Sequence, residues 1–242
     1  IYFSIPPTCT MSNVFFRQFF EGVSSTYTYL LACPETKEAI LIDPVVETAD
    51  RDAGYIKEMG FELKYAINTH CHADHVTGTA ALKTHFPAMQ TTISAASGAR
   101  AEVLFNEGDK LVFGSRSVTC LATPGHTDGC FCFVLDDNSM VFTGDTLLIR
   151  GCGRTDFQAG NPEGLYDMVQ SKLFTLPDSC AVFPAHDYKG RTQSSIGEEK
   201  QFNLRLTKTK EEFVEIMANL NLSYPKQIDR ALPLNMKGGY DE

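Results

Sequence analysis

The side chains best suited to chemistry are histidines and aspartates near the middle of the chain. The densest group is the heptapeptide 69–75, Thr-His-Cys-His-Ala-Asp-His, which fits the pattern H-x-H-x-D-H. In an extended segment, side chains two residues apart project to the same side, so the imidazoles of His70 and His72 can face one ion. Asp74 and His75 follow at an expected helix start, where the helix dipole favours an aspartate. Imidazoles and carboxylates are common metal ligands, so this segment predicts a metal site.

Three further candidate ligands follow, each after an apolar stretch and a small or turn-forming residue. They are His126 in Pro-Gly-His, Asp145 in Gly-Asp-Thr and His186 in Pro-Ala-His. Each of these turns alone would be interpreted as structural, and segment 69–75 alone could be a capped loop with solvated histidines. Five of the six histidines follow predicted strands, and the carboxyl ends of strands can converge on one rim. Together these residues predict a single site.

The number of candidate ligands leaves the metal content open. Seven side chains, one of them a bridging aspartate, suffice for two ions about 3.5 Å apart, which would activate a water for hydrolysis. Spacing alone therefore favours a dinuclear hydrolase. Cys71 lies between two candidate ligands, but alternation points its side chain away from them, and we expect it to pack in the core, as we do Cys152.

Strands alternating with helices are expected to position these residues. We predict strands at 27–33, 38–43, 61–68, 110–113, 118–122, 131–135, 140–143 and 180–183. We predict helices at 50–59, at 76–85, at 161–174 and, as one or two helices, within 198–219. The third helix begins Asn-Pro-Glu, a capping residue followed by proline at the first helical position. This interleaving indicates a layered α/β protein with helices outside the sheets.

Length and composition fit one domain. The 242 residues contain no repeat and no linker rich in Pro, Gly and Ser, so we predict a single domain over 1–242 in which residues 1–12 are a disordered or processed segment. Residues 1–10 hold no basic side chain and do not resemble an intact signal or transit peptide. The eight cysteines are scattered without a CxxC pair, which suits a reducing compartment.

The charge balance disfavours two classes of partner. Lys and Arg number 21 against 30 Asp and Glu, and the resulting net charge of −9 repels nucleic acid and anionic membrane surfaces. No apolar run approaches the roughly 20 residues that a membrane span requires. We therefore expect neither nucleic acid nor membrane as a partner.

The ordered set H-x-H-x-D-H, Pro-Gly-His, Gly-Asp and Pro-Ala-His resembles the metallo-β-lactamase superfamily over nearly the whole chain. The resemblance implies an α/β fold, a four-layer αβ/βα sandwich of mixed sheets with the metal at one edge between them. Within the superfamily, the stretch 144–158, above all Gly-Arg-Thr-Asp-Phe at 153–157, and the compact tail 203–238 resemble the persulfide dioxygenases. That family implies oxidation of glutathione persulfide by O₂ to sulfite and glutathione, in mitochondrial sulfide catabolism.

The resemblance also implies which residues hold the metal. Carried over by position, the family's iron ligands fall on His70, His126 and Asp145, with one Fe(II) per chain. Two imidazoles and one carboxylate leave coordination positions open for substrate and O₂. Four other residues match positions that hold a second metal in hydrolytic relatives, and here they would orient the iron ligands: His72, Asp74, His75 and His186. The resemblance, not the spacing, moves our expectation to mononuclear iron.

Cationic and aromatic side chains are expected to bind the substrate. Glutathione carries two carboxylates, which arginine binds through a planar fork. We predict Arg154, Tyr188 and Arg205 as substrate-binding residues, with surface ion pairs or helix-face charges as the alternative interpretation. Arg150 and Lys189 are weaker candidates. Eukaryotic relatives imply the mitochondrial matrix, other relatives the cytoplasm, and we consider a homodimer as the assembly.

Two other functions compete with this hypothesis. A dinuclear glutathione thioester hydrolase like glyoxalase II has the same metal motif, but the run at 153–157 and a tail too short for that family's additional helical domain argue against it. A non-catalytic binding module stabilised by zinc would not need every ligand position to be retained. A nuclease has the least support, because the chain is acidic and has no basic stripe.

Overall fold

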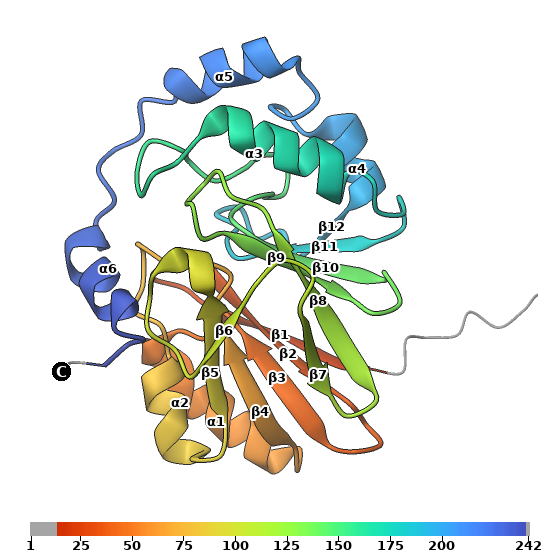
Figure 1. Ribbon diagram of the computed structural model, residues 1–242, viewed down its shortest axis with the longest axis vertical. Coiled ribbons are helices and arrows are strands. Elements are labelled where there is room, and N and C mark those ends of the chain that lie inside the picture. Colours follow the sequence, from red (N-terminus) through yellow and green to blue (C-terminus); the bar gives the residue numbers. More distant parts are fainter. Residues whose placement is uncertain (1–13, 241–242) are drawn as a thin grey trace, which may run out of the picture.

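A computed structural model describes residues 14–240, and within them the strands form two sheets (Figure 1). The first sheet has the strand order β1-β2-β3-β4-β5-β6, antiparallel from β1 to β3 and parallel from β3 to β6. Its strands are β1 (Phe15–Glu21), β2 (Thr26–Ala32), β3 (Glu38–Ile42), β4 (Glu62–Ile67), β5 (Gln90–Ser94) and β6 (Val103–Phe105).

The second sheet has the order β12-β11-β10-β9-β8-β7 and is also mixed, because β10 and β11 are parallel while the other neighbours are antiparallel. Its strands are β7 (Lys110–Phe113), β8 (Arg116–Ala122), β9 (Phe131–Leu135), β10 (Met140–Gly144), β11 (Ala181–Pro184) and β12 (Ser194–Ser195).

Helices cover the outer face of each sheet (Figure 1). On the first sheet, apolar residues of α1 (Ala49–Glu58) and α2 (Thr79–His85) share a cluster with Leu30, Leu41 and Ala66. The second sheet is covered by α3 (Pro162–Met168), a π-helical turn η3 (Val169–Leu173), α4 (Ile196–Phe202) and α5 (Lys210–Ala218). Short 3₁₀ turns occur at η1 (Val46–Thr48) and η2 (Ala95–Ser97), and α6 (Ile228–Met236) lies at one edge of the molecule.

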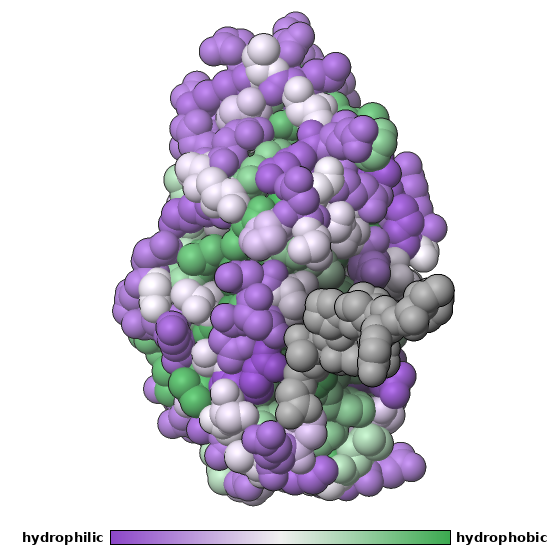
Figure 2. Space-filling view, turned by 90° about the vertical axis from the view of Figure 1, so that its right-hand side faces the viewer, coloured by the Kyte–Doolittle hydropathy of each residue, from purple (hydrophilic) through white to green (hydrophobic). Residues whose placement is uncertain are grey.

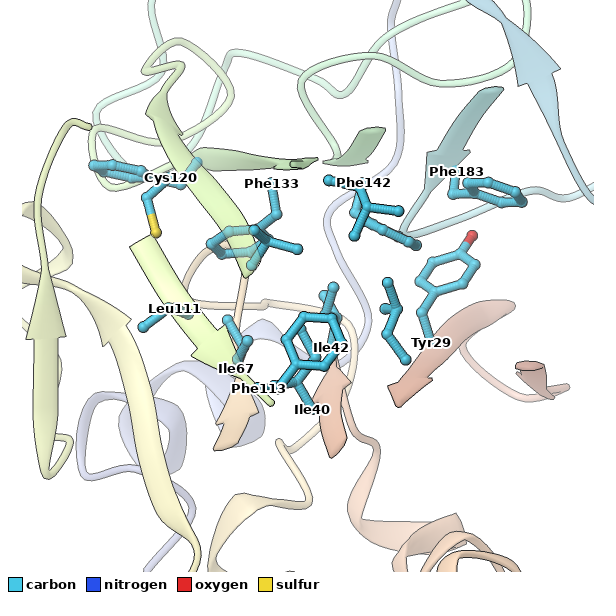
Figure 3. Close-up of a cluster of buried hydrophobic side chains, with 14 of the residues drawn as sticks. Tyr29, Ile40, Ile42, Ile67, Leu111, Phe113, Cys120, Phe133, Phe142 and Phe183 are labelled. Carbon is cyan, nitrogen blue, oxygen red and sulfur yellow. The ribbon is translucent and has the colours of Figure 1, made fainter. Parts of the chain in front are cut away.

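The inner faces of the two sheets enclose an apolar core. Phe142 of β10 stacks on Phe183 of β11, with ring centroids 5.5 Å apart, and its ring lies 5.1 Å from that of Tyr29 on β2 (Figure 3). Ile40 and Ile42 of β3 reach the same cluster from the first sheet. Apolar side chains between the sheets and beneath the helices hold the layers together. The expected four-layer sandwich of mixed sheets is confirmed.

Every predicted strand is present, with ends that agree within two residues. Strands β1, β5, β6 and β12 and helix α6 were not predicted, and α6 contains Pro233, which in sequence argues against a helix interior. The helix predicted at 76–85 begins only at Thr79, because the backbone of 76–78 pairs with 44–46 instead. The helix predicted at 161–174 becomes π-helical after Met168. The segment 1–12 lies outside the described residues.

The surface on one face of the molecule is largely polar. The face in Figure 2 is mainly hydrophilic, with small hydrophobic areas between polar side chains. None of the helices within residues 14–240 combines the length and apolar character that a bilayer crossing demands.

Candidate metal centre

The candidate ligands lie on loops that leave neighbouring strand ends of both sheets. His70, His72, Asp74 and His75 follow β4 of the first sheet, in a loop that has no helix before Thr79. The expectation that Asp74 and His75 begin a helix is therefore wrong. The other candidates come from the second sheet, after β8, β10 and β11 respectively: His126, Asp145 and His186. The site consequently sits where the two sheets meet at one edge.

Three of the predicted ligands meet at this edge. Donor atoms of His70, His126 and Asp145 all lie within 4.8 Å of one another. The rings of His70 and His126 are 4.9 Å apart and nearly perpendicular, and His126 Nε2 lies 3.5 Å from Asp145 Oδ2. Two imidazole nitrogens and a carboxylate oxygen, with no thiolate among them, are a donor set for iron, zinc or another divalent transition metal.

Hydrogen bonds orient these donors toward one another. His126 Nδ1 bonds to the carbonyl oxygen of Arg154 at 2.6 Å, so this nitrogen carries the proton and Nε2 is left as the electron-pair donor. His70 Nδ1 lies 3.0 Å from Thr69 Oγ1, which itself donates to Asp43 Oδ2. Asp145 Oδ1 accepts from His186 Nδ1 at 2.7 Å, leaving Oδ2 toward His126. The three residues therefore present Nε2, Nε2 and Oδ2 to a shared position.

A second group lies beside the first. Donor atoms of His72, Asp74 and His75 also fall within 4.8 Å of one another. Asp74 Oδ2 accepts from His75 Nδ1 at 2.9 Å and from His186 Nε2 at 2.8 Å. Among the described residues, the buried nitrogens His72 Nδ1 and His75 Nε2 have no hydrogen-bond partner. The second group therefore meets the donor requirement for an ion too, and the geometry admits one ion or two.

The local charges set the protonation states that metal binding requires. Burial, with the imidazoles of His72 and His126 nearby, lowers the pKa of His70 well below its usual value. Burial would raise the pKa of Asp145, but the neighbouring imidazoles, led by His186, hold it below its usual value. Burial acts against protonation of His186, yet the carboxylates of Asp145 and Asp74 raise the pKa of its imidazole well above the ordinary value. A neutral histidine and an ionised aspartate are the forms that bind a cation.

Two cysteines near the site pack in apolar surroundings, as predicted. Cys71 clusters with Ile93 and Ala99, and burial raises the pKa of its thiol to about 12. Cys152 lies 3.7 Å from Met217 Sδ and also lines the cavity described below, and burial raises the pKa of its thiol to about 11. All cysteines among the described residues are free. At neutral pH these two are thiols, not thiolate ligands.

A cavity of about 740 Å³ is lined by His126 and Asp145 of the first group of donors. The predicted substrate-binding residues Arg154, Tyr188 and Arg205 all line it, as do Arg150 and Lys189. Two further cationic lining residues were not singled out from the sequence: Arg191 and Lys226. A volume of this size fits a tripeptide-sized ligand.

The cationic side chains of the cavity differ in how they are held. The Arg154 guanidinium forks onto Asp156 at 2.6 and 2.7 Å and donates to the Ser223 carbonyl. Arg150 pairs with Glu198 at 2.6 Å. Arg205 donates to the Cys152 carbonyl and forms no ion pair with another residue in the described part of the chain. Its positive charge is therefore the least neutralised of the three.

Tyr188 stands at the wall of the cavity. Its side chain is 71% exposed, and its ring lies parallel to that of His186 with centroids 6.1 Å apart. A neutral phenol that reaches from the donor cluster into the cavity can donate a hydrogen bond to a bound ligand.

Two residues of the site were missed in the sequence. Asp43 is buried and accepts from the Thr69 amide at 2.7 Å and from His72 Nε2 at 3.0 Å. In the sequence it is only the last residue of the strand predicted at 38–43. Thr26 Oγ1 lies 3.1 Å from His186 Nε2 and 3.3 Å from His75 Nδ1. A threonine in a strand carries no sequence signal for such a role, whereas a buried aspartate after a strand could have been suspected.

Comparison with known proteins shows the family of the chain. Residues 22–186 match the family described as the metallo-beta-lactamase superfamily. The chain is 57% identical over 226 residues to mouse "Persulfide dioxygenase ETHE1, mitochondrial", covering 93% of this chain and 89% of the mouse protein. The human protein of the same name is 56% identical with the same coverage. The crystal structure of ETHE1 from Myxococcus xanthus superposes with a TM-score of 0.90 at 48% identity, covering 93% of this chain and all of that chain.

Proposed function

The chain belongs to the metallo-β-lactamase superfamily and, within it, to the ETHE1 persulfide dioxygenases, and we propose that it oxidises glutathione persulfide at one Fe(II) ion held by His70, His126 and Asp145. It is an oxidoreductase. The observation that supports the site is the convergence of these three donors, two of which, His126 and Asp145, line a cavity that has several cationic lining residues.

The proposed reaction balances with one water. One glutathione persulfide, one O₂ and one water give one glutathione, one sulfite dianion and two protons. The S–S bond breaks, the outer sulfur loses four electrons, and O₂ takes them up. A bound ferrous ion supplies redox chemistry and open coordination positions for this step. The protein supplies ligands whose protonation is already set, and a cavity that holds the substrate beside them.

The cavity residues would bind the glutathione part of the substrate. We propose that Arg205, whose guanidinium forms no ion pair with another described residue, binds a carboxylate, with Tyr188 donating a hydrogen bond nearer the donor cluster. Arg154 is already forked onto Asp156, so we assign it the edge of the cavity, where Arg154 and Asp156 together can bind carboxylate and ammonium groups.

We assign His72, Asp74, His75 and His186 to holding the ligands in place. His186 bridges Asp145 and Asp74 with bonds of 2.7 and 2.8 Å, which fixes the Asp145 carboxylate. The mouse and human relatives are mitochondrial proteins by name, and a mitochondrial matrix location is our proposal for this chain. The homodimer stays a prediction.

A dinuclear glutathione thioester hydrolase is the second candidate, and one observation favours it. His72 Nδ1 and His75 Nε2 are buried without a hydrogen-bond partner in the described residues, as expected of nitrogens that bind a second ion. Against this function, Asp74 and Asp145 each already accept a hydrogen bond from His186 through one carboxylate oxygen. Metal content per chain separates the two functions.

The test is to load metal-free protein with Fe(II) and to follow O₂ consumption with glutathione persulfide. We expect one iron per chain and one sulfite per O₂, with no hydrolysis of a glutathione thioester. Loss of iron in His126→Ala would support the ligand assignment. Two metals per chain together with thioester hydrolysis, or an iron-loaded protein that consumes no O₂, would reject the proposal.

A further inference from the structure

The loop that carries the H-x-H-x-D-H motif has little regular structure of its own. Residues 68–78 form neither helix nor strand, apart from one bridge between Thr77 and Val45. Buried backbone carbonyls and amides need hydrogen-bond partners, so such a loop must find them elsewhere in the chain. One partner is Gln158, whose side-chain nitrogen donates to the Cys71 carbonyl at 2.8 Å.

Three further bonds to the loop come from one side chain of helix α6. Asn235 Nδ2 donates to the carbonyl of His72 at 2.9 Å and to that of His75 at 2.8 Å. Its Oδ1 accepts from the Thr77 amide at 2.8 Å. Both amide protons and the amide oxygen are used, so the orientation of the carboxamide is fixed by its partners.

The position of Asn235 is itself well supported. The side chain is buried, and α6 is held by bonds that do not involve it: Arg100 N donates to the Met236 carbonyl at 2.9 Å and Thr79 Oγ1 to the Gly238 carbonyl at 3.0 Å. Leu232, one turn earlier, packs against the cluster that contains Cys71. Contacts other than those of Asn235 therefore fix the position of α6 beside the loop.

We infer that Asn235 is a positioning residue of the metal centre, which couples the docking of α6 to metal binding. The two carbonyls that it holds flank Asp74, which bonds to His186, which in turn bonds to the Asp145 carboxylate. Loss of the carboxamide would free the loop that carries His70. The inference rests on the proposed metal centre, but it does not depend on which ion is bound or which reaction occurs.

Coupling of this kind is reciprocal. If docked α6 raises the affinity for metal by some factor, metal must favour docked α6 by the same factor. The metal should therefore slow amide hydrogen exchange in residues 228–239, which lie far along the sequence from every proposed ligand. Helix α5 (Lys210–Ala218), which makes no described bond to the loop, serves as the reference segment.

The experiment titrates full-length protein, stripped of metal by a chelator, with Co(II) and follows its absorption. Asn235→Asp keeps the acceptor for the Thr77 amide but loses both donors, and Asn235→Ala removes all three bonds. Both should weaken Co(II) binding roughly 10–100-fold, as loss of groups that orient ligands does elsewhere. Asp229→Asn is the matched control, because Asp229 is an exposed residue of α6 that bonds to Tyr224 and not to the loop. It should bind Co(II) like the wild type.

The melting temperature of the stripped proteins distinguishes positioning from a merely structural role. Variants that melt earlier but bind Co(II) with wild-type affinity while folded would overturn the inference. If a variant does not fold, amide hydrogen exchange in the wild type provides the test. The inference is also overturned if Co(II) does not slow exchange in residues 228–239 relative to α5. A wild type that binds no Co(II) would overturn the metal centre along with it, whereas iron binding without O₂ consumption would affect only the proposed reaction.

Discussion

At the scale of single residues, the site depends on backbone atoms as much as on ligands. The Arg154 carbonyl orients His126, and the Gly153 amide donates to the Asp145 carbonyl at 2.7 Å. The stretch 153–157, which in sequence suggested the family, therefore acts partly through its main chain. A substitution at 153–157 should therefore disturb the ligands only if it displaces this backbone.

Gly153→Ala should weaken metal binding. A Cβ at this position would lie 2.5 Å from the Asp145 carbonyl oxygen and 2.9 Å from His126 Nδ1, so two ligands would have to move. We expect a loss of roughly 10–100-fold in metal affinity. Gly151→Ala is the control, because its Cβ would meet no atom within 4 Å. Equal metal affinity of the two variants would contradict the prediction, and isothermal titration measures it.

Arg154→Glu should raise the KM for glutathione persulfide without removing iron. The side chain lines the cavity, whereas the group that orients His126 is the backbone carbonyl of the same residue. Reversing the charge also places two carboxylates together at Asp156, so Arg154→Gln is the milder companion variant. Steady-state kinetics with iron analysis checks this, and unchanged KM in both variants would exclude Arg154 from substrate binding.

At the scale of elements, helix ends and helix faces determine local stability. The predicted capping of the third helix is confirmed: the side-chain oxygen of Asn161 accepts from the Gly164 amide at 3.1 Å, and Pro162 begins α3. The backbone amide of Asn161 also donates to the Gly125 carbonyl, next to His126. The start of α3 thus fixes one of the turns that carry ligands.

Asn161→Ala should lower the free energy of unfolding by about 1 kcal/mol, the usual effect of losing such a cap. Asn161→Asp keeps an acceptor for the Gly164 amide and should stay close to the wild type. Urea unfolding of the metal-free proteins measures both. A loss of equal size in the two variants would show that the cap is not the cause.

Asp52 in α1 should make stability depend on pH. Burial raises the pKa of Asp52 to about 6, although Arg51 pairs with its carboxylate at 2.8 Å. In the unfolded chain the same group releases its proton near its ordinary pKa of about 4. The folded form therefore binds the proton more tightly, so the contribution of Asp52 to stability is greatest below pH 4 and falls as the pH rises to 6.

The measurement compares wild type with Asp52→Asn by urea unfolding at pH 4 and pH 7. A difference of two pKa units corresponds to about 3 kcal/mol. We expect the stability of the wild type relative to Asp52→Asn to fall by roughly that amount between the two pH values. A relative stability that stays constant or rises with pH would contradict the assignment.

At the scale of the whole molecule, the metal centre joins the two sheets. His70 follows β4 of the first sheet, while His126 and Asp145 follow β8 and β10 of the second. The core between the sheets, built around Phe142 and Tyr29, sets how closely these loops approach. An ion bound by all three residues would link both halves of the sandwich.

Metal removal should therefore lower the melting temperature. A ligand that binds only the folded state at 100 times its Kd adds about 2.7 kcal/mol of stability. We expect Fe(II) or Zn(II) to raise the melting temperature of stripped wild-type protein and to have much less effect on His70→Ala. Differential scanning calorimetry checks this, and an equal rise in both proteins would place the ion elsewhere.

The sequence alone predicted the ligand positions, the layered arrangement of strands and helices and, through the Gly-Arg-Thr-Asp-Phe run, the family. These features are local: a histidine pair at spacing two, apolar strands and an Asn-Pro helix start can each be recognised within a few residues. Short edge strands such as β12 and a proline-containing helix such as α6 could not, since tertiary contacts rather than local propensity stabilise them.

Only the tertiary structure decided which distant groups hold the ligands. Asp43 lies 29 residues before His72 and Asn235 lies 163 residues after it, yet both bond to that residue. Hydrogen-bond partners across such distances are chosen by how the layers pack, because a buried polar group bonds to whatever the fold brings within reach. The same packing brings the buried carboxamide of Asn235, in the last helix, to the metal centre that the motif at 69–75 predicts.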